Sequence, residues 1–157
     1  MKSFLILLVI GMNSYAGFPS QREVRTLFRK AATNENACRN LVKQLQPYNE
    51  KNNPLLAGYR ACATMLMAKY VFNPFTRLSN FSKGRTLLEK SIAADKENIE
   101  LRFLRYAIQT KAPFFLNYRS SLKEDEGMIT GSLSKMDDND LKTTIVAFLK
   151  QEKIIKE

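Results

Sequence analysis

Apolar residues recur along most of this chain at intervals of three and four, which is the spacing of one buried face of a helix. No stretch of useful length shows the strict alternation of a half-buried strand. The spacing predicts about seven helices: residues 21–32, a second helix that is capped by Asn34 or Asn36 and ends near Pro47, and then residues 54–72, 74–95, 97–110, 121–136 and 138–150. We therefore expect an all-α fold in a single domain over residues 17–157, with a frayed tail from about residue 151.

Capping residues mark several of the expected helix starts. The Asn-Pro pairs at residues 53–54 and 73–74 each combine an N-cap asparagine with a proline at the first helical position. Ser121 and Glu124 have the spacing of a capping box. The helix over residues 54–72 is apolar nearly all round, so we expect it to lie at the centre of the core.

The stretch at residues 83–106 has the pattern of two helices joined by one tight turn. Gly84, Leu88 and Ser91 share a face of the first of these helices. A glycine inside a helix costs about 1 kcal/mol relative to alanine. We therefore expect the backbone of a neighbouring helix to pass close to Gly84, although simple tolerance of a glycine is the alternative.

The spacing of Gly84, Leu88 and Ser91, followed by the turn at residues 95–98, resembles the second helix of a tetratricopeptide repeat and the start of the next unit. The match covers about one unit of roughly 34 residues. The resemblance implies a right-handed stack of antiparallel helix pairs, a TPR-like α-α superhelix.

The chain departs from that repeat at three positions. Lys96 stands where the family has a proline, and Arg102 and Arg105 stand near its aromatic residue and its leucine. Residues 98–109, NIELRFLRYAIQ, also resemble a group of short exported helical proteins of Bacteroidetes-type bacteria. This second resemblance implies export and a helical fold, and no particular chemistry.

Residues 1–16 have the parts of a signal peptide. Lys2 precedes an apolar run over residues 4–10, and residues 14–16, Ser-Tyr-Ala, have the small-x-small form that signal peptidase recognises. A membrane anchor is the alternative, but the run is well short of the roughly 20 residues that span a bilayer. We expect cleavage before Gly17 and a mature protein that is periplasmic or secreted.

Positive charge is concentrated in the N-terminal half. The full sequence carries 25 Lys and Arg against 15 Asp and Glu, a formal net charge of +10. Residues 17–94 hold 13 basic and 4 acidic side chains, whereas residues 95–157 hold 11 of each. The basic half can attract anionic surfaces such as lipid headgroups or acidic polysaccharide. We expect no specific nucleic-acid partner.

Two polar stripes are candidate contacts for an anion or a partner. Arg22, Arg25 and Arg29 form the first, on the helix over residues 21–32. This stripe is either a solvated face or an anion-binding surface.

Arg102, Arg105 and Gln109 form the second stripe, along one side of an otherwise apolar helix. Arginines in such a setting need partners. One interpretation pairs them with carboxylates, for which the candidates are Glu89, Glu100, Asp125 and Glu126. The other interpretation is a pocket for a carboxylate or phosphate ligand.

Cys38 and Cys62 are the two cysteines of the chain, and such a pair in an exported protein favours a disulfide. In an antiparallel helix hairpin with its turn near Lys51, the two side chains would be offset by only about 3 Å along the helix axes. We expect a bridge between them. The alternative is two buried free thiols.

The sequence contains no histidine, and therefore lacks the commonest general base, the nucleophile systems built on it and most zinc geometries. Glycine-rich phosphate loops are absent, and residues 137–140, Asp-Asp-Asn-Asp, lack the glycine and glutamate of a calcium loop. We expect no catalytic residue, no metal and no cofactor.

Three kinds of function remain. The first is a non-enzymatic helical interaction module that binds an envelope protein or peptide in a groove between helices. The second is a binder of anionic surfaces, and the third is an enzyme that uses an arginine and a carboxylate in an open pocket. The aromatic connector at residues 114–118 either packs over the helix ends or serves as a docking surface.

Overall fold

The computed structural model describes residues 19–153. Its α-helices are α1 (Gln21–Ala31), α2 (Glu35–Gln44), α3 (Pro54–Leu66), α4 (Pro74–Ala94), α5 (Ile99–Lys111), α6 (Leu122–Ser132) and α7 (Asn139–Gln151). Three short 3-10 helices accompany them: η1 (Met67–Lys69), η2 (Phe114–Leu116) and η3 (Leu133–Lys135). These residues form seven α-helices and no strand, which confirms the all-α prediction. The predicted signal peptide and the last four residues of the tail lie outside the described residues.

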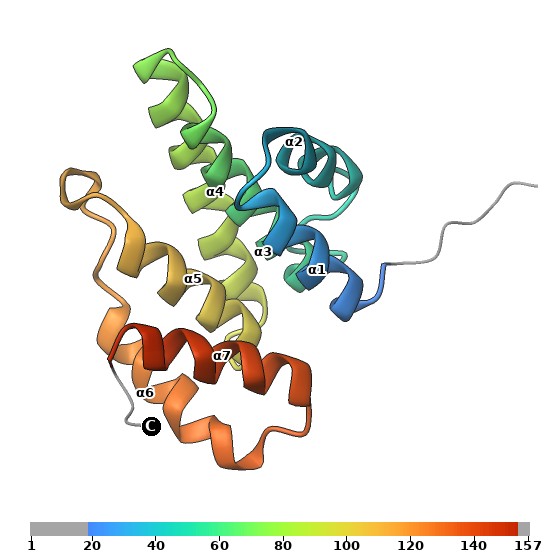
Figure 1. Cartoon of the computed structure of the whole chain (residues 1–157), viewed down its shortest axis with the longest axis vertical. Helices are drawn as coiled ribbons and strands as arrows, with labels where there is room; N and C mark the ends of the chain where they lie inside the picture. Colours follow the sequence, from blue (N-terminus) through green and yellow to red (C-terminus); the bar gives the residue numbers. More distant parts are fainter. Residues whose placement is uncertain (1–18, 154–157) are drawn as a thin grey trace, which may run out of the picture.

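α3 lies at the centre of the fold, where its apolar sequence predicted it (Figure 1). It contacts α1, α2, α4 and α5, and nine of its 13 residues are buried. The helix is shorter than predicted, because its last turn tightens into η1 after Leu66. Asn73 then takes an extended conformation (φ −70°, ψ 121°) and caps α4, as expected for a residue before proline.

α3 and α4 form an antiparallel pair with a very close approach at Gly84. A Cβ atom on Gly84 would lie 2.5 Å from the backbone oxygen of Ala61 and 2.5 Å from Cγ of Met65. Gly58, earlier in α3, lies against Leu88, later in α4, so the two helices run in opposite directions. The predicted close approach at Gly84 is confirmed, and a side chain there does not fit.

Two hydrophobic clusters share α5. The larger is built from α1 to α5, and the smaller from α5, α6 and α7. Leu101 and Leu104 of α5 belong to the larger cluster, whereas Phe103 and Tyr106 belong to the smaller. Figure 1 shows the same division, with α6 and α7 on one side of α5 and α3 and α4 on the other. None of the helices between residues 19 and 153 is long and apolar enough to cross a membrane.

The predicted disulfide is not formed, because Cys38 and Cys62 are both buried free thiols. The Cys38 thiol donates a 3.3 Å hydrogen bond to the backbone oxygen of Ala63, so its sulfur is directed at the α3 backbone. Burial raises the pKa of both thiols. Both therefore behave as small apolar core residues and not as activated nucleophiles.

The predicted capping box at the start of α6 is also not formed. The Ser121 side chain makes no capping hydrogen bond. Glu124 accepts a hydrogen bond from Arg102 instead, at 2.7 Å. An ion pair across two helices has replaced the local capping contact that the sequence suggested.

Candidate functional site

The arginines of α5 are buried and bonded to carboxylates on the helices on either side. Arg105 donates from Nε and Nη2 to both oxygens of Asp125 at 2.7 Å, and from Nη1 to Glu89 at 2.8 Å. Arg102 donates from Nη1 to Glu124 at 2.7 Å and to Asp125 at 3.2 Å. Asp125 is completely buried. These bonds clamp α4, α5 and α6 together, and they agree with the pairing interpretation.

The surroundings of Arg105 and Tyr118 raise the pKa of both side chains. Burial alone would lower the pKa of Arg105, but its hydrogen bonds to Asp125 and the charges of Asp125 and Glu89 outweigh burial and raise the pKa. Tyr118 donates a 2.5 Å hydrogen bond to Glu89, and burial followed by this contact raises the pKa of the phenol. Arg105 stays charged and Tyr118 stays neutral near pH 7, so neither is prepared to transfer a proton.

Arg25 is the centre of a second buried network. Its Nε and Nη2 donate to the two oxygens of Glu100 at 2.7 Å, and the Tyr59 hydroxyl donates to the same carboxylate at 2.5 Å. The guanidinium also donates to Asp138 at 2.8 Å and to Asp140 at 3.1 Å. The hydrogen bond that Arg25 donates to Glu100 is the largest cause of the raised pKa of Arg25. This network joins α1, α3 and α5 to the start of α7.

The two predicted stripes are therefore not intact surfaces. Arg22 and Arg29 are exposed, whereas Arg25 between them is buried in its carboxylate network. Gln109 is fully buried, and neither atom of its amide has a hydrogen-bond partner among residues 19–153. Arg102, Arg105 and Gln109 lie inside the fold and do not line the groove described next.

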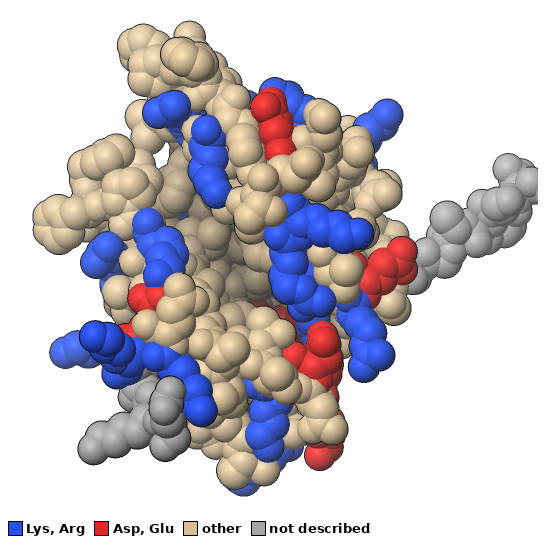
Figure 2. All heavy atoms as spheres, in the orientation of Figure 1, with Lys and Arg blue, Asp and Glu red and all other residues tan. Residues whose placement is uncertain are grey.

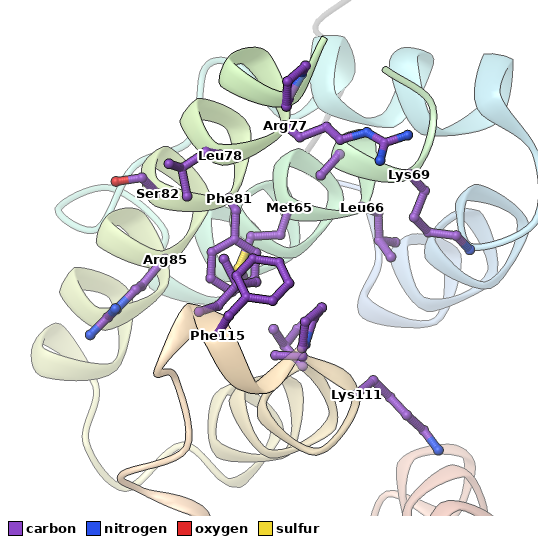
Figure 3. A pocket seen from close by; sticks show the side chains of 16 residues that line it. Met65, Leu66, Lys69, Arg77, Leu78, Phe81, Ser82, Arg85, Lys111 and Phe115 are labelled. Carbon is purple, nitrogen blue, oxygen red and sulfur yellow. The ribbon is translucent and has the colours of Figure 1, made fainter. Parts of the chain in front are cut away.

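An open groove of about 820 Å³ lies between α4 and the segment that follows α5 (Figure 3). Four parts of the chain form it: the end of α3 with η1, the first half of α4, the end of α5, and η2. Its walls are mainly apolar, with large side chains from Met65, Leu66, Leu78, Phe81, Ile108, Phe115 and Leu116.

Exposed phenylalanines lie in two of the segments that contribute to this groove. Phe72 and Phe75 at the start of α4 are 99% and 83% exposed, and Phe114 and Phe115 on η2 are 83% and 81% exposed. Figure 2 shows the surface hollowed between the top of the molecule and the projection at its left, with Lys and Arg side chains nearby. Within the connector at residues 114–118, Tyr118 packs inside, whereas the two phenylalanines face solvent, so a docking role for them stays a prediction.

All charged residues that line the groove are basic: Lys69, Arg77, Arg85 and Lys111. Arg77 and Lys69 donate to backbone oxygens at 2.6 and 2.8 Å, and Arg85 lies 4.8 Å from the centre of a tyrosine ring. Lys111 forms an ion pair with Glu152. Three of the four cations therefore have no carboxylate partner in the part of the chain that the structure describes.

A second, more polar groove of about 560 Å³ lies between α2, α3 and α4. Its charged lining residues are again all basic: Arg39, Lys43, Arg60 and Lys83. Arg39 is paired with Glu35 at 2.6 Å, and Arg60 donates to a backbone oxygen at 2.6 Å. This groove has a smaller apolar surface and no exposed aromatic residue in its lining.

Sequence reasoning missed the larger groove, because its walls come from separate segments of the chain. The one local signal was the run of aromatic residues at 114–118, where a docking surface was an alternative. No sequence pattern indicated that Arg77 and Arg85 would lack a carboxylate partner within residues 19–153. Whether an arginine is paired depends on which carboxylates the fold brings close to it.

Comparisons of the chain with models of protein families, with curated proteins and with solved structures found no match. Within residues 19–153, no group of three or more His, Cys, Asp or Glu side chains is arranged to hold a metal ion.

Proposed function

We propose that this chain is a non-enzymatic helical module that binds a segment of a partner protein in the groove between α4 and η2. The observation that carries the proposal is an apolar groove lined by the exposed Phe115, with further exposed phenylalanines at residues 72, 75 and 114, close in the chain to the lining residues Pro74 and Pro113. Contiguous exposed apolar patches of this kind mark interaction sites on soluble proteins. Aromatic residues and arginine, which surround this groove, are also the residue types enriched in protein interfaces.

The walls of the groove are held by contacts that do not involve a partner, which supports a preformed site. α4 is fixed against α3 by the close approach at Gly84. On the opposite wall, Asn117 takes a left-handed conformation (φ 45°) that turns the chain back, so that Tyr118 reaches Glu89. A preformed site loses less conformational entropy when a partner binds.

The arginine networks support a structural role and not catalysis. Arg102 and Arg105 are held by carboxylates beneath packed side chains, away from the groove. An enzyme that uses an arginine and a carboxylate needs both in an open site that admits a substrate. We therefore propose a binding function without a catalytic step.

The arrangement of helices is proposed to be a right-handed stack of antiparallel pairs, similar to a tetratricopeptide repeat. Contacts between α1 and α2, between α3 and α4, and between α5 and α6 support this arrangement. We place the mature protein in the periplasm or outside the cell, with cleavage before Gly17, on the basis of the signal-peptide pattern of residues 1–16. The partner would then be an envelope or secreted protein.

Binding to an anionic surface is the second candidate, and the smaller groove favours it. Arg39, Lys43, Arg60 and Lys83 converge there without an acidic residue in the lining. Such binding predicts retention of the protein on heparin or anionic vesicles that falls steeply as salt is raised. Retention that is absent, or that does not respond to salt, would reject this candidate.

Site-specific photocrosslinking tests the main proposal. A photoreactive phenylalanine analogue replaces Phe115 at the groove or, as a control, exposed Ser134 on η3. We expect a discrete crosslinked partner in the envelope fraction from position 115 and none from position 134. Equal crosslinking at both positions, or none at either, would reject the groove as a binding site.

A further inference from the structure

We infer that the partner segment that occupies the groove between α4 and η2 carries apolar anchor residues with carboxylates on both sides of them. The inference rests on the proposed function and adds the chemistry of the partner. The sign, the availability and the position of the charges around the groove support it.

The sign of the charge is uniform. Four of the 16 residues that line the groove are basic and none is acidic. The chain does not lack nearby acidic residues in general, because Glu89 lies on the same helix as Arg77 and Arg85. Glu89 accepts hydrogen bonds from Arg105 and Tyr118 and is not among the residues that line the groove, which therefore has no acidic side chain in its lining.

The charges are also available to a partner. Arg77 and Arg85 are exposed and form no ion pair within residues 19–153. A backbone oxygen or an aromatic face satisfies only part of a guanidinium, which has five N–H donors. Each guanidinium therefore still has N–H groups that can donate two hydrogen bonds to one carboxylate of a partner.

The positions of the charges favour a peptide over an amphiphile with a single charged end as the ligand of the groove. Figure 3 shows Arg85 at one side of the groove and Lys69 and Lys111 at the other, with Phe81 and Phe115 between them. A fatty acid or a detergent carries one charged end and can satisfy only one side. A peptide continues in both directions from its anchor residues and can place carboxylates at both ends.

The size of the groove agrees with this occupant. Its volume of about 820 Å³ is within the range of pockets that hold a few large side chains or a drug-sized molecule. The apolar residues of the groove can bury the anchor side chains. Its basic residues favour acidic segments over basic or neutral ones.

Selection from a random peptide display library tests the inference without a known partner. The mature chain over residues 17–157 is the target, and Phe115→Ser removes peptides that do not use the groove. We expect groove-dependent peptides to contain Leu, Phe or Ile anchors with Asp or Glu on both sides. Their affinity should fall about tenfold in the variant R77E/R85E. The matched variant K43E/K83E changes the same charge on the smaller groove and should leave affinity unchanged.

The outcomes separate the inference from the proposed function. Groove-dependent peptides that are neutral, basic or acidic on one side only would overturn the inference and leave the groove as a peptide site. A library that yields no groove-dependent peptide would overturn both. Binding to phosphatidylcholine and phosphatidylglycerol vesicles that Phe115→Ser abolishes, without peptide binding, would also overturn both and assign the groove to a membrane surface.

Discussion

The arginines of α5 and the arginines of α4 are the same residue type in opposite situations. Arg105 is buried and donates three hydrogen bonds to carboxylates. Arg77 and Arg85 are exposed and have no carboxylate partner among the residues that the structure describes. A buried guanidinium without a partner is strongly destabilising, whereas an exposed one is solvated at little cost. The first group therefore explains how the helices are held, and the second is free to serve a partner.

The difference between paired and unpaired basic residues also helps to explain the uneven distribution of charge along the sequence. Five of the 11 acidic residues in the segment 95–157 take part in the two buried networks, where they pair with Arg25, Arg102 and Arg105. Seven of the 13 basic residues of residues 17–94 line the two grooves instead. About half of the basic side chains of the N-terminal half thus lie at the two grooves.

Loss of the Asp125 carboxylate should have the largest effect on stability. Asp125→Ala leaves Arg102 and Arg105 buried with fewer partners, and breaking a buried pair in this way costs about 3–5 kcal/mol. Urea unfolding, followed by circular dichroism, measures the free energy of unfolding. Glu35→Ala is the control, because its pair with Arg39 is exposed and should contribute less than about 1 kcal/mol.

If Asp125→Ala lowers the free energy of unfolding by less than about 1 kcal/mol, the buried pairs contribute no more than the exposed pair, and the proposed difference between the two groups of arginines is wrong. The isosteric variant Asp125→Asn distinguishes shape from charge. It keeps the volume of the side chain and should still lose most of the stabilisation, because an amide cannot balance two guanidinium groups.

The helices and the asparagine caps of α3 and α4 followed from local sequence, whereas the capping box at Ser121 did not form and the partners of the buried arginines followed only in part. Asn53, Asn73 and the apolar spacing are local signals, and each lies where expected. Glu89 and Asp125 were among the predicted partners of Arg105, yet Glu100 pairs with Arg25, 75 residues away in the chain. Contacts at that distance depend on how α1 packs on α5. For the same reason the groove, which is assembled from separate segments, had no sequence pattern of its own.

Gln109 differs from the other buried polar residues of α5, because Arg102 and Arg105 have carboxylate partners and the Gln109 amide has no hydrogen-bond partner within residues 19–153. Because neither amide atom is hydrogen-bonded within residues 19–153, Gln109→Met should raise the free energy of unfolding by about 1 kcal/mol. Gln44→Met, at an exposed position on α2, should change it by less than about 0.5 kcal/mol. A loss of stability in Gln109→Met would show that water bonds the buried amide.

Asp138 allows the Arg25 network to be tested by pH, with a smaller effect because the side chain is 39% exposed. Its hydrogen bond from Arg25 is the largest cause of a pKa lowered from the ordinary value of 3.8. The charged form therefore stabilises the fold above that value, and the stabilisation is lost as pH falls below it. Asp138→Asn keeps the capping contact to Leu141 but removes the charge. The stability difference from the natural protein should be present at neutral pH and disappear at low pH, and a constant difference would contradict this assignment.

Removal of the two α4 arginines should have the smallest effect on stability and the clearest effect on binding. Arg77 and Arg85 are exposed, so R77A/R85A should shift the free energy of unfolding by less than about 0.5 kcal/mol. Arg105→Ala, measured beside it, should lose several times more, because it leaves Asp125 buried without its main partner. The same R77A/R85A protein should bind groove-dependent acidic peptides more weakly, and that deficit should shrink as salt screens the lost charges. If R77A/R85A instead unfolds as easily as Arg105→Ala, the α4 arginines hold the fold as well, and their lack of carboxylate partners no longer indicates a binding site.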